Sequence, residues 1–291
     1  MTDARQVLTA RPDVTYEVTN TGVGVVERPL SLYQRLANHG GLRKVLVLVV
    51  LALIWEVYAR WLANDLLFPT FSATIVAFWD AFVTGELIKA TWYSMKILFQ
   101  GYAAGLILAG LLTAFASATR IGADLLEVLT AMFNPLPSIA LLPLAMIWFG
   151  LGNAGIVFVL IHAVLWSVAL NTHAGFRGVS PTWRMVGQNY GLSSFGYVTR
   201  ILIPGAFPSI LTGLKIGWAF AWRTLIAAEL VFGANSGGGG LGWFIFQSKN
   251  SLEIPSVFAG LLTVILLGLI VENFIFLTAE KMTIRRWGMQ T

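Results

Sequence analysis

The chain has 291 residues, of which 57% are hydrophobic and only 11% are charged, and its formal net charge is +5. A soluble domain usually carries about a quarter charged residues, so this composition excludes an ordinary water-soluble protein and indicates a membrane protein. The basic residues stand at the ends of apolar runs, which argues against nucleic-acid binding, and the lack of Cys together with three scattered His argues against disulfides, thiol catalysis and a metal centre.

The first 43 residues are polar and mixed, and no apolar run begins before Val45. A secretory signal would place a short apolar core near the start and follow it with a small-residue cleavage site, and neither is found. We therefore expect residues 1–43 to be a polar cytoplasmic segment that the protein retains.

Six apolar stretches approach the roughly 20 residues that a helix needs to cross a bilayer. They run over 44–62, 97–118, 126–149, 155–173, 210–232 and 257–277. We predict an all-α polytopic membrane protein with about six transmembrane helices over 44–278 and a cytoplasmic tail over 279–291. Residues 68–90, between the first two stretches, read as an amphipathic or interfacial helix.

Three prolines interrupt the third stretch. Pro135, Pro137 and Pro143 each remove a backbone donor, so this helix should kink, with neighbouring helices satisfying the freed carbonyls.

Small residues recur four positions apart, as Gly101 with Gly105 and Gly213 with Gly217. Such pairs permit close approach of two helices. Packing inside one subunit is the simpler interpretation, and the pairs do not by themselves indicate a dimer.

The basic residues at the span ends are concentrated on one side of the predicted membrane, which places that side in the cytoplasm. This side includes Arg120, Arg177, Arg184 and Lys281, whereas the other has Arg60, Lys89, Lys96 and Lys249. Six spans with both termini in the cytoplasm satisfy the distribution, and loop 175–208 is then cytoplasmic as well.

Loop 175–208 is the longest cytoplasmic connection between predicted spans and should form a compact helix–turn–helix. Pro181 suits the first position of a short helix, and Gly191 suits the left-handed residue that ends it. Ser193 or Ser194 would cap a second helix. Pro204 and Pro208 should stop that helix before the fifth span.

The tip of this loop should expose Tyr190, Leu192 and Phe195. An apolar tip with a polar rim suits docking into a groove on another protein. The candidate docking residues are Gly187, Gln188, Asn189, Tyr190, Gly191, Leu192, Ser193, Ser194, Phe195 and Pro204.

The same loop resembles the cytoplasmic coupling loop of bacterial ABC importer permeases, whose pattern is E-A-A-x-x-x-G-x9-I-x-L-P. Gly191 takes the place of the motif glycine, and Ile201, Ile203 and Pro204 take the later positions, with Ile203 for Leu. The opening triplet departs from the pattern, because residues 185–187 are Met, Val and Gly. Which local salt bridge holds the loop without the glutamate is therefore open.

Two further stretches, NPLPSIALLPLAMIWFGLG (134–152) and GLKIGWAFAWRTLIAAELVFGANSGGGGLG (213–242), resemble permeases of the nitrate, sulfonate, taurine and bicarbonate uptake group. The resemblance implies a type I ABC importer permease fold in the bacterial cytoplasmic (inner) membrane. It also implies a second permease copy, two ATP-hydrolysing partner subunits and an external solute-binding protein. The sequence has no G-x-x-x-x-G-K-[ST] motif, so ATP and Mg²⁺ are expected on the partner ATPase and no cofactor on this chain.

Ionisable residues inside a span cost about 2.5–3.5 kcal/mol each on insertion scales and are candidates for function. Arg223 and Trp222 would line a translocation path, where a fixed cation and an aromatic face suit an anionic solute. Alternatively, Arg223 bonds the carbonyls that the third-span prolines release. Asn134 at that break is a candidate polar contact.

Glu229 and His162 complete the candidates for the path. Glu229 precedes a glycine-rich external loop, so its carboxylate either faces the path or anchors the backbone amides of that loop. His162 is either a satisfied interior histidine or a proton relay, and no second titratable residue accompanies it on its span.

These features favour the permease subunit of an ATP-driven importer for a small, anionic solute, itself not an enzyme. The alternative is an ion-coupled secondary carrier, in which Arg223, Glu229 and His162 would be coupling residues, but that function gives no reason for the apolar-tipped loop. An intramembrane enzyme ranks last, because no paired carboxylates, Ser/His set or metal cluster align across the spans.

Overall fold

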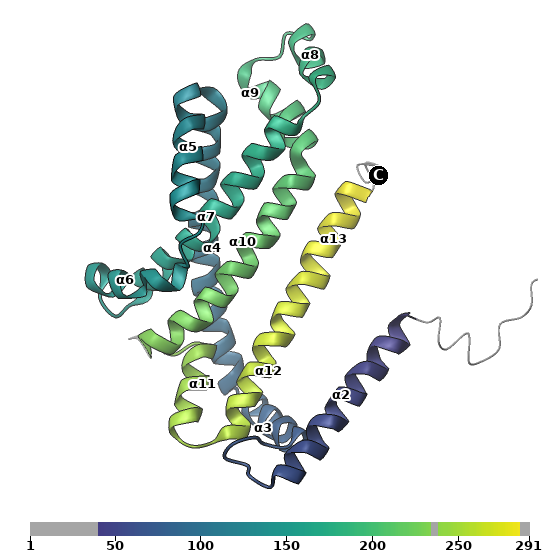
Figure 1. Ribbon diagram of the computed structural model, residues 1–291, viewed down its shortest axis with the longest axis vertical. Coiled ribbons are helices and arrows are strands. Elements are labelled where there is room, and N and C mark those ends of the chain that lie inside the picture. Colours follow the sequence, from purple (N-terminus) through teal and green to yellow (C-terminus); the bar gives the residue numbers. More distant parts are fainter. Residues whose placement is uncertain (1–39, 234–237, 286–291) are drawn as a thin grey trace, which may run out of the picture. The chain divides into compact units, whose positions relative to one another are not determined.

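The computed structural model describes residues 40–233 and 238–285, whose regular elements are helices (Figure 1). The chain divides into two compact units, residues 1–51 and 52–291, and helix α2 (Gly40–Leu62) runs from the first into the second. All packing described below lies within the second unit. The predicted all-α class is confirmed.

Within the described residues, five helices are long and apolar enough to cross a membrane, and each contains one of the predicted spans. Three of them are α2, α4 (Glu86–Ala118) and α7 (Asn153–Gly178). The fourth covers Phe195–Phe232 and ends with α10 (Ile203–Phe232), and the fifth covers Ile254–Thr283 and begins with α12 (Ile254–Ile270). The helices extend beyond the predicted ranges because hydropathy detects only the apolar part of a helix.

The third predicted span is broken rather than merely kinked. It consists of α5 (Arg120–Phe133), a 3₁₀ turn η1 (Ser138–Leu141) and α6 (Leu142–Phe149), and the two halves differ in direction by 87°. Pro135 and Pro137 fall in the gap, where they withhold two backbone donors within three residues. Pro143 stands in the first turn of α6, where a missing donor is harmless.

The remaining elements are short. They are α3 (Phe71–Val83), α8 (Pro181–Asn189), α9 (Ser194–Tyr197), η2 (Val198–Leu202), α11 (Leu241–Asn250), η3 (Val271–Phe276), α13 (Leu277–Glu280) and η4 (Lys281–Arg285).

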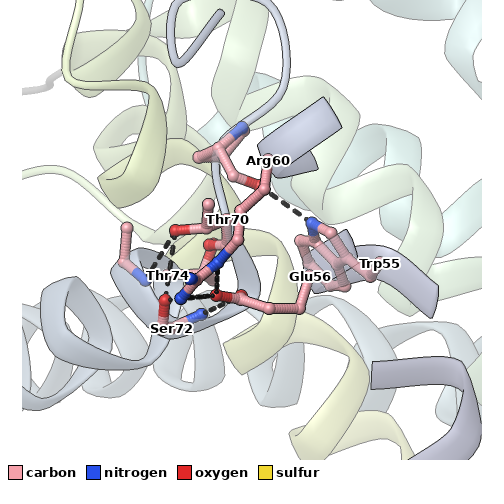
Figure 2. Close-up of polar contacts among 8 residues, drawn as sticks. Trp55, Glu56, Arg60, Thr70, Ser72 and Thr74 are labelled. Atoms are coloured by element: carbon pink, nitrogen blue, oxygen red, sulfur yellow. Dashed lines mark hydrogen bonds and ion pairs between the residues drawn. The ribbon is translucent and has the colours of Figure 1, made fainter. Parts of the chain in front are cut away.

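The predicted amphipathic helix over 68–90 is two elements, α3 and the first turns of α4, separated by Gly85 at φ +79°. Figure 2 shows how α3 is joined to the end of α2. The Glu56 carboxylate accepts the Ser72 N–H and hydroxyl at 3.0 Å each and pairs with Arg60 at 2.7 Å. Thr70 caps α3 by accepting the Ala73 N–H at 3.2 Å. A carboxylate at a helix amino terminus is favoured by the helix dipole, so this corner is held electrostatically.

Helix α7 packs against both α4 and α10 (Figure 1). A Cβ atom at Gly101 of α4 would lie 2.5 Å from Leu160 Cβ of α7, and one at Gly213 of α10 would lie 2.9 Å from Asn171 Cβ. The glycine pairs therefore serve packing inside one chain, as the simpler interpretation held.

We expect Gly101→Ala to lower the free energy of unfolding by about 1–3 kcal/mol, because the added methyl overlaps Leu160 in a tightly packed contact. Thermal unfolding of the purified protein in detergent measures the effect. Gly110→Ala in the same helix is the control, because its added Cβ has no neighbour within 4 Å. Equal unfolding temperatures for the two variants would contradict the packing role.

The expectation that Pro204 and Pro208 stop the loop helix is wrong. The helix runs on from Phe195 to Phe232, with Pro204 in the first turn of α10 and Pro208 inside it. Directly before Pro204 lies the π-helical turn η2, in which the Ile203 N–H bonds to the Val198 carbonyl five residues back. This wider turn accommodates the proline ring without ending the helix.

Candidate functional site

Loop 175–208 forms the helix–turn–helix that its sequence predicts, although the second helix continues into α10. Helix α8 begins at Pro181, and Gly191 has φ +62°, in the left-handed region that favours glycine. The Leu192 N–H bonds back to the Gly187 carbonyl, which is the Schellman pattern of a helix end. Ser193 is the cap of the second helix, because its hydroxyl accepts the Gly196 N–H at 3.2 Å.

The surface of this loop is apolar and exposed at its turn. Tyr190 and Phe195 are each 80% exposed, and Trp183 and Met185 on α8 are exposed as well. Leu192 is half-buried and lines an apolar cavity of about 930 Å³ between the loop, α4, α7 and α10. The side chains of Gln188 and Ser194 lie outside the described part of the structure.

Two contacts hold α8 in place, one against the end of α7 and one against the second helix of the loop. Arg184 donates to the Phe176 carbonyl at 2.7 Å and to the Val179 carbonyl at 3.1 Å, so its guanidinium occupies the carboxyl end of α7. Gly187 is buried, and a Cβ there would lie 2.8 Å from the Tyr197 ring. Arg184 and Gly187 thus hold α8 at and just before residues 185–187, which stand where the coupling-loop pattern that this chain resembles has Glu-Ala-Ala.

A second feature is a largely apolar cavity of about 340 Å³ beside the break between α5 and α6, which contains a few polar side chains and which we name the Arg223 cavity. Its walls bring together three of the residues predicted for the path: Asn134 from the break, His162 from α7 and Arg223 from α10. Ser138 and Trp166 also line it. Residues separated by as many as 89 positions therefore meet at one place, where the broken span lies against the packed pair α7 and α10.

Arg223 is exposed on this cavity, and it makes no hydrogen bond or ion pair with any residue of 40–233 or 238–285. None of the carbonyls released at the prolines in that part of the chain accepts from it. The geometry therefore favours the interpretation in which the guanidinium faces a cavity over the one in which it holds the bundle together.

His162 lies deeper in the same wall. Its Nδ1 is 3.2 Å from the Ser138 hydroxyl, while its buried Nε2 has no hydrogen-bond partner in the described residues. Phe133 and Trp166 stack beside it with ring centroids 5.3 Å apart. This environment is mainly apolar, and Ser138 is the partner that sequence reasoning did not identify.

Trp222 does not face the Arg223 cavity. It is 8% exposed and lines a neighbouring cavity of about 350 Å³, together with Arg223, Lys215 and Glu272. Lys215 forms an ion pair with Glu280 of α13 at 2.7 Å.

Glu229 lies apart from both cavities at the end of α10. It is 2% exposed, and the Ser94 hydroxyl lies 2.7 Å from its Oε1 and 2.9 Å from its Oε2. The Gly242 N–H donates to its Oε2 at 2.8 Å, and the Leu241 N–H donates to the Ser94 hydroxyl at 2.8 Å. Glu229 and Ser94 thus bind the first amides of α11. This geometry supports the interpretation in which Glu229 anchors backbone amides over the one in which it faces the path.

Gly239 and Gly240, which precede α11, lie too close to neighbouring side chains to carry a side chain of their own. A Cβ at Gly240 would lie 2.1 Å from Glu229 Oε1, and one at Gly239 would lie 1.9 Å from Trp243 Cδ1. Side chains at either position would displace the carboxylate or the indole, so the backbone approaches them only as glycine.

Comparisons with known proteins agree with these features. The family model described as binding-protein-dependent transport system inner membrane component matches residues 101–284, which is more than half of the chain. The nitrate import permease protein NrtB of Synechocystis is 26% identical over 80% of this chain and 86% of its own length. The taurine transport system permease protein TauC of Escherichia coli is 32% identical over 51% of this chain and 52% of its own.

Proposed function

The chain belongs to the family of binding-protein-dependent transport system inner membrane components, and on that basis we propose that it is the permease subunit of an ATP-driven importer for a small anionic solute. The similar proteins NrtB and TauC are named for nitrate and taurine. Nitrate is an anion, and taurine carries a sulfonate group. Solutes of this class would present a compact negative charge to the translocation path.

The Arg223 cavity is the observation that supports an anionic solute. It holds a guanidinium without a partner in the described residues, beside the amide of Asn134. A planar, permanently charged donor group suits sulfonate, nitrate and carboxylate oxygens. The surrounding walls are largely apolar, which strengthens the attraction between the guanidinium and an anion.

The same cavity supports a second permease copy. A charged side chain that faced lipid would cost several kcal/mol, and Arg223 is exposed on this side of the bundle. A second copy packed over the α5–α6 break and α10 would cover the charge and enclose the path between two chains.

Loop 175–208 would bind the ATPase partner, with one loop for each of two ATPase subunits. ATP and Mg²⁺ would bind those subunits, and closure of the ATPases would move the loops and rock the two permease copies around the path. An extracytoplasmic solute-binding protein would deliver the solute at the opposite side. In this arrangement the chain lies in the bacterial cytoplasmic membrane with both termini in the cytoplasm, and residues 1–43 and 279–291 flank the permease domain.

An ion-coupled secondary carrier was the alternative. Neither the family match nor the names of the similar proteins favours it. In addition, the residues it would use are dispersed: Glu229 anchors α11, whereas His162 and Arg223 lie at the cavity.

Uptake in proteoliposomes tests the proposal. The permease purified with its ATPase and binding protein should accumulate labelled taurine or nitrate only with ATP on the ATPase side, and uncharged glycerol should not compete. Transport by this chain alone, driven by a proton gradient, would instead establish the secondary carrier.

A further inference from the structure

One continuous helix joins three features of the molecule. It runs from Phe195 at the tip of loop 175–208 to Phe232. Arg223 lies on it at the cavity, and Glu229 lies near its far end. A displacement of the loop therefore moves the backbone that carries both side chains.

At that far end, three elements are connected through one carboxylate. We name this group the α11 anchor: Glu229 of α10, Ser94 of α4 and the amides of Leu241 and Gly242 at the start of α11. All of its hydrogen bonds are between 2.7 and 2.9 Å. Ser94 and Glu229 are fully or almost fully buried, so water does not compete for these bonds.

Helix α11 in turn forms part of the wall of an outer cavity of about 940 Å³. The opposite wall comes from α3 and the start of α4, and α11 contributes Trp243, Phe244, Gln247 and Ser248. The shape of this cavity consequently depends on where the first turn of α11 is held.

We propose that Glu229 is a positioning residue that makes α11 follow α10, so that movement of the coupling loop opens and closes the outer cavity. This inference rests on the proposed function, because it requires an ATPase to move the loop. A buried carboxylate is an expensive way merely to pack two helices, and apolar side chains of similar size usually do so at least as well. A carboxylate that accepts backbone N–H groups, in contrast, fixes an amide in the first turn of α11 to one point on α10.

The lack of Cys in the chain allows a direct test. Gln247 is exposed and lines the outer cavity, so Gln247→Cys provides a single reporter for labelling by a membrane-impermeant maleimide. In the assembled complex, its labelling rate should differ by about tenfold between the nucleotide-free state and the state trapped with ATP and vanadate, as for a coupling free energy of ordinary size.

Adding Glu229→Gln should abolish that difference and lower the solute transported per ATP hydrolysed, while the complex still assembles. The amide keeps the size of the side chain but loses the charge that attracts two donors. Ser94→Ala should act in the same direction, and it decides the question if Glu229→Gln fails to assemble. Ser117→Ala on the same helix is the matched control, because that hydroxyl bonds within α4, to the Thr113 carbonyl at 2.8 Å.

A labelling rate that still responds to nucleotide in the anchor variants would overturn the inference and leave the proposed function intact. Absence of both ATP-driven uptake and any nucleotide response in the unaltered complex would overturn both. A loss of response in Ser117→Ala equal to that in Ser94→Ala would also overturn it, because the effect would then be general to α4.

Discussion

Replacing Phe195 with aspartate is expected to abolish ATP-driven uptake while the protein remains folded in the membrane. Phe195 is 80% exposed, so the substitution removes little internal packing. An aromatic anchor at a protein interface typically contributes about 2 kcal/mol or more, and the added charge would have to be desolvated, so ATPase affinity should fall by about thirtyfold or more.

Co-purification of the ATPase with the tagged permease measures this effect, and uptake and ATP hydrolysis are recorded on the same preparation. Leu67→Asp is the control, because Leu67 is an equally apolar, exposed residue in the connection between α2 and α3. Undiminished ATPase binding by the Phe195 variant would remove loop 175–208 from the interface. Loss of binding in both variants would show a general effect of surface charge.

Arg223→Ala should give the second large effect, a loss of uptake by about ten- to a hundredfold at low solute concentration. A hydrogen bond to a charged group contributes about 1.5–3 kcal/mol, and the guanidinium supplies the cation of the Arg223 cavity. Arg223→Lys should recover part of the rate, because it keeps the charge but not the planar pair of donors. Assembly with the ATPase should be unchanged in both variants.

The control for this variant is Lys249→Ala, which removes an exposed cation from the end of α11. Uptake measured over a range of solute concentrations separates weaker binding from slower transport. Normal uptake by Arg223→Ala would show that the cavity is not on the solute path, and loss of the assembled complex would return Arg223 to a structural role.

The features that sequence predicted well are those encoded locally. Hydropathy located the spans, and Pro181 and Gly191 each have a backbone preference that specifies one position in loop 175–208. The capping hydroxyl was narrowed to Ser193 or Ser194, and the structure selects Ser193. The prolines of the third span predicted a bend but not a turn of 87°, because the bend angle depends on which neighbouring helices receive the two halves. The π-helical turn before Pro204 carries no residue pattern of its own, so the continuous helix was missed.

The contacts that sequence could not supply join distant residues. Ser94 and Glu229 are 135 positions apart, and Lys215 and Glu280 are 65 apart. A serine within an apolar span gives no sign of its partner, because such hydroxyls commonly bond within their own helix. Glu229 itself was identifiable as a buried charge before a glycine-rich segment, and Arg184 was recognised only as a basic residue on the cytoplasmic side. Three of the five path candidates share one cavity, but only the tertiary structure separates Trp222 and Glu229 from them.

The helix from Phe195 to Phe232 has 38 residues, which at about 1.5 Å per residue gives a length near 57 Å. The hydrocarbon layer of a bilayer is only about 30 Å thick. At the average tilt of about 20° this helix would span about 54 Å, more than the roughly 40–45 Å that includes the headgroups, so it would project past them on at least one side. The aromatic residue at its amino end would then reach a water-soluble enzyme that never touches the lipid.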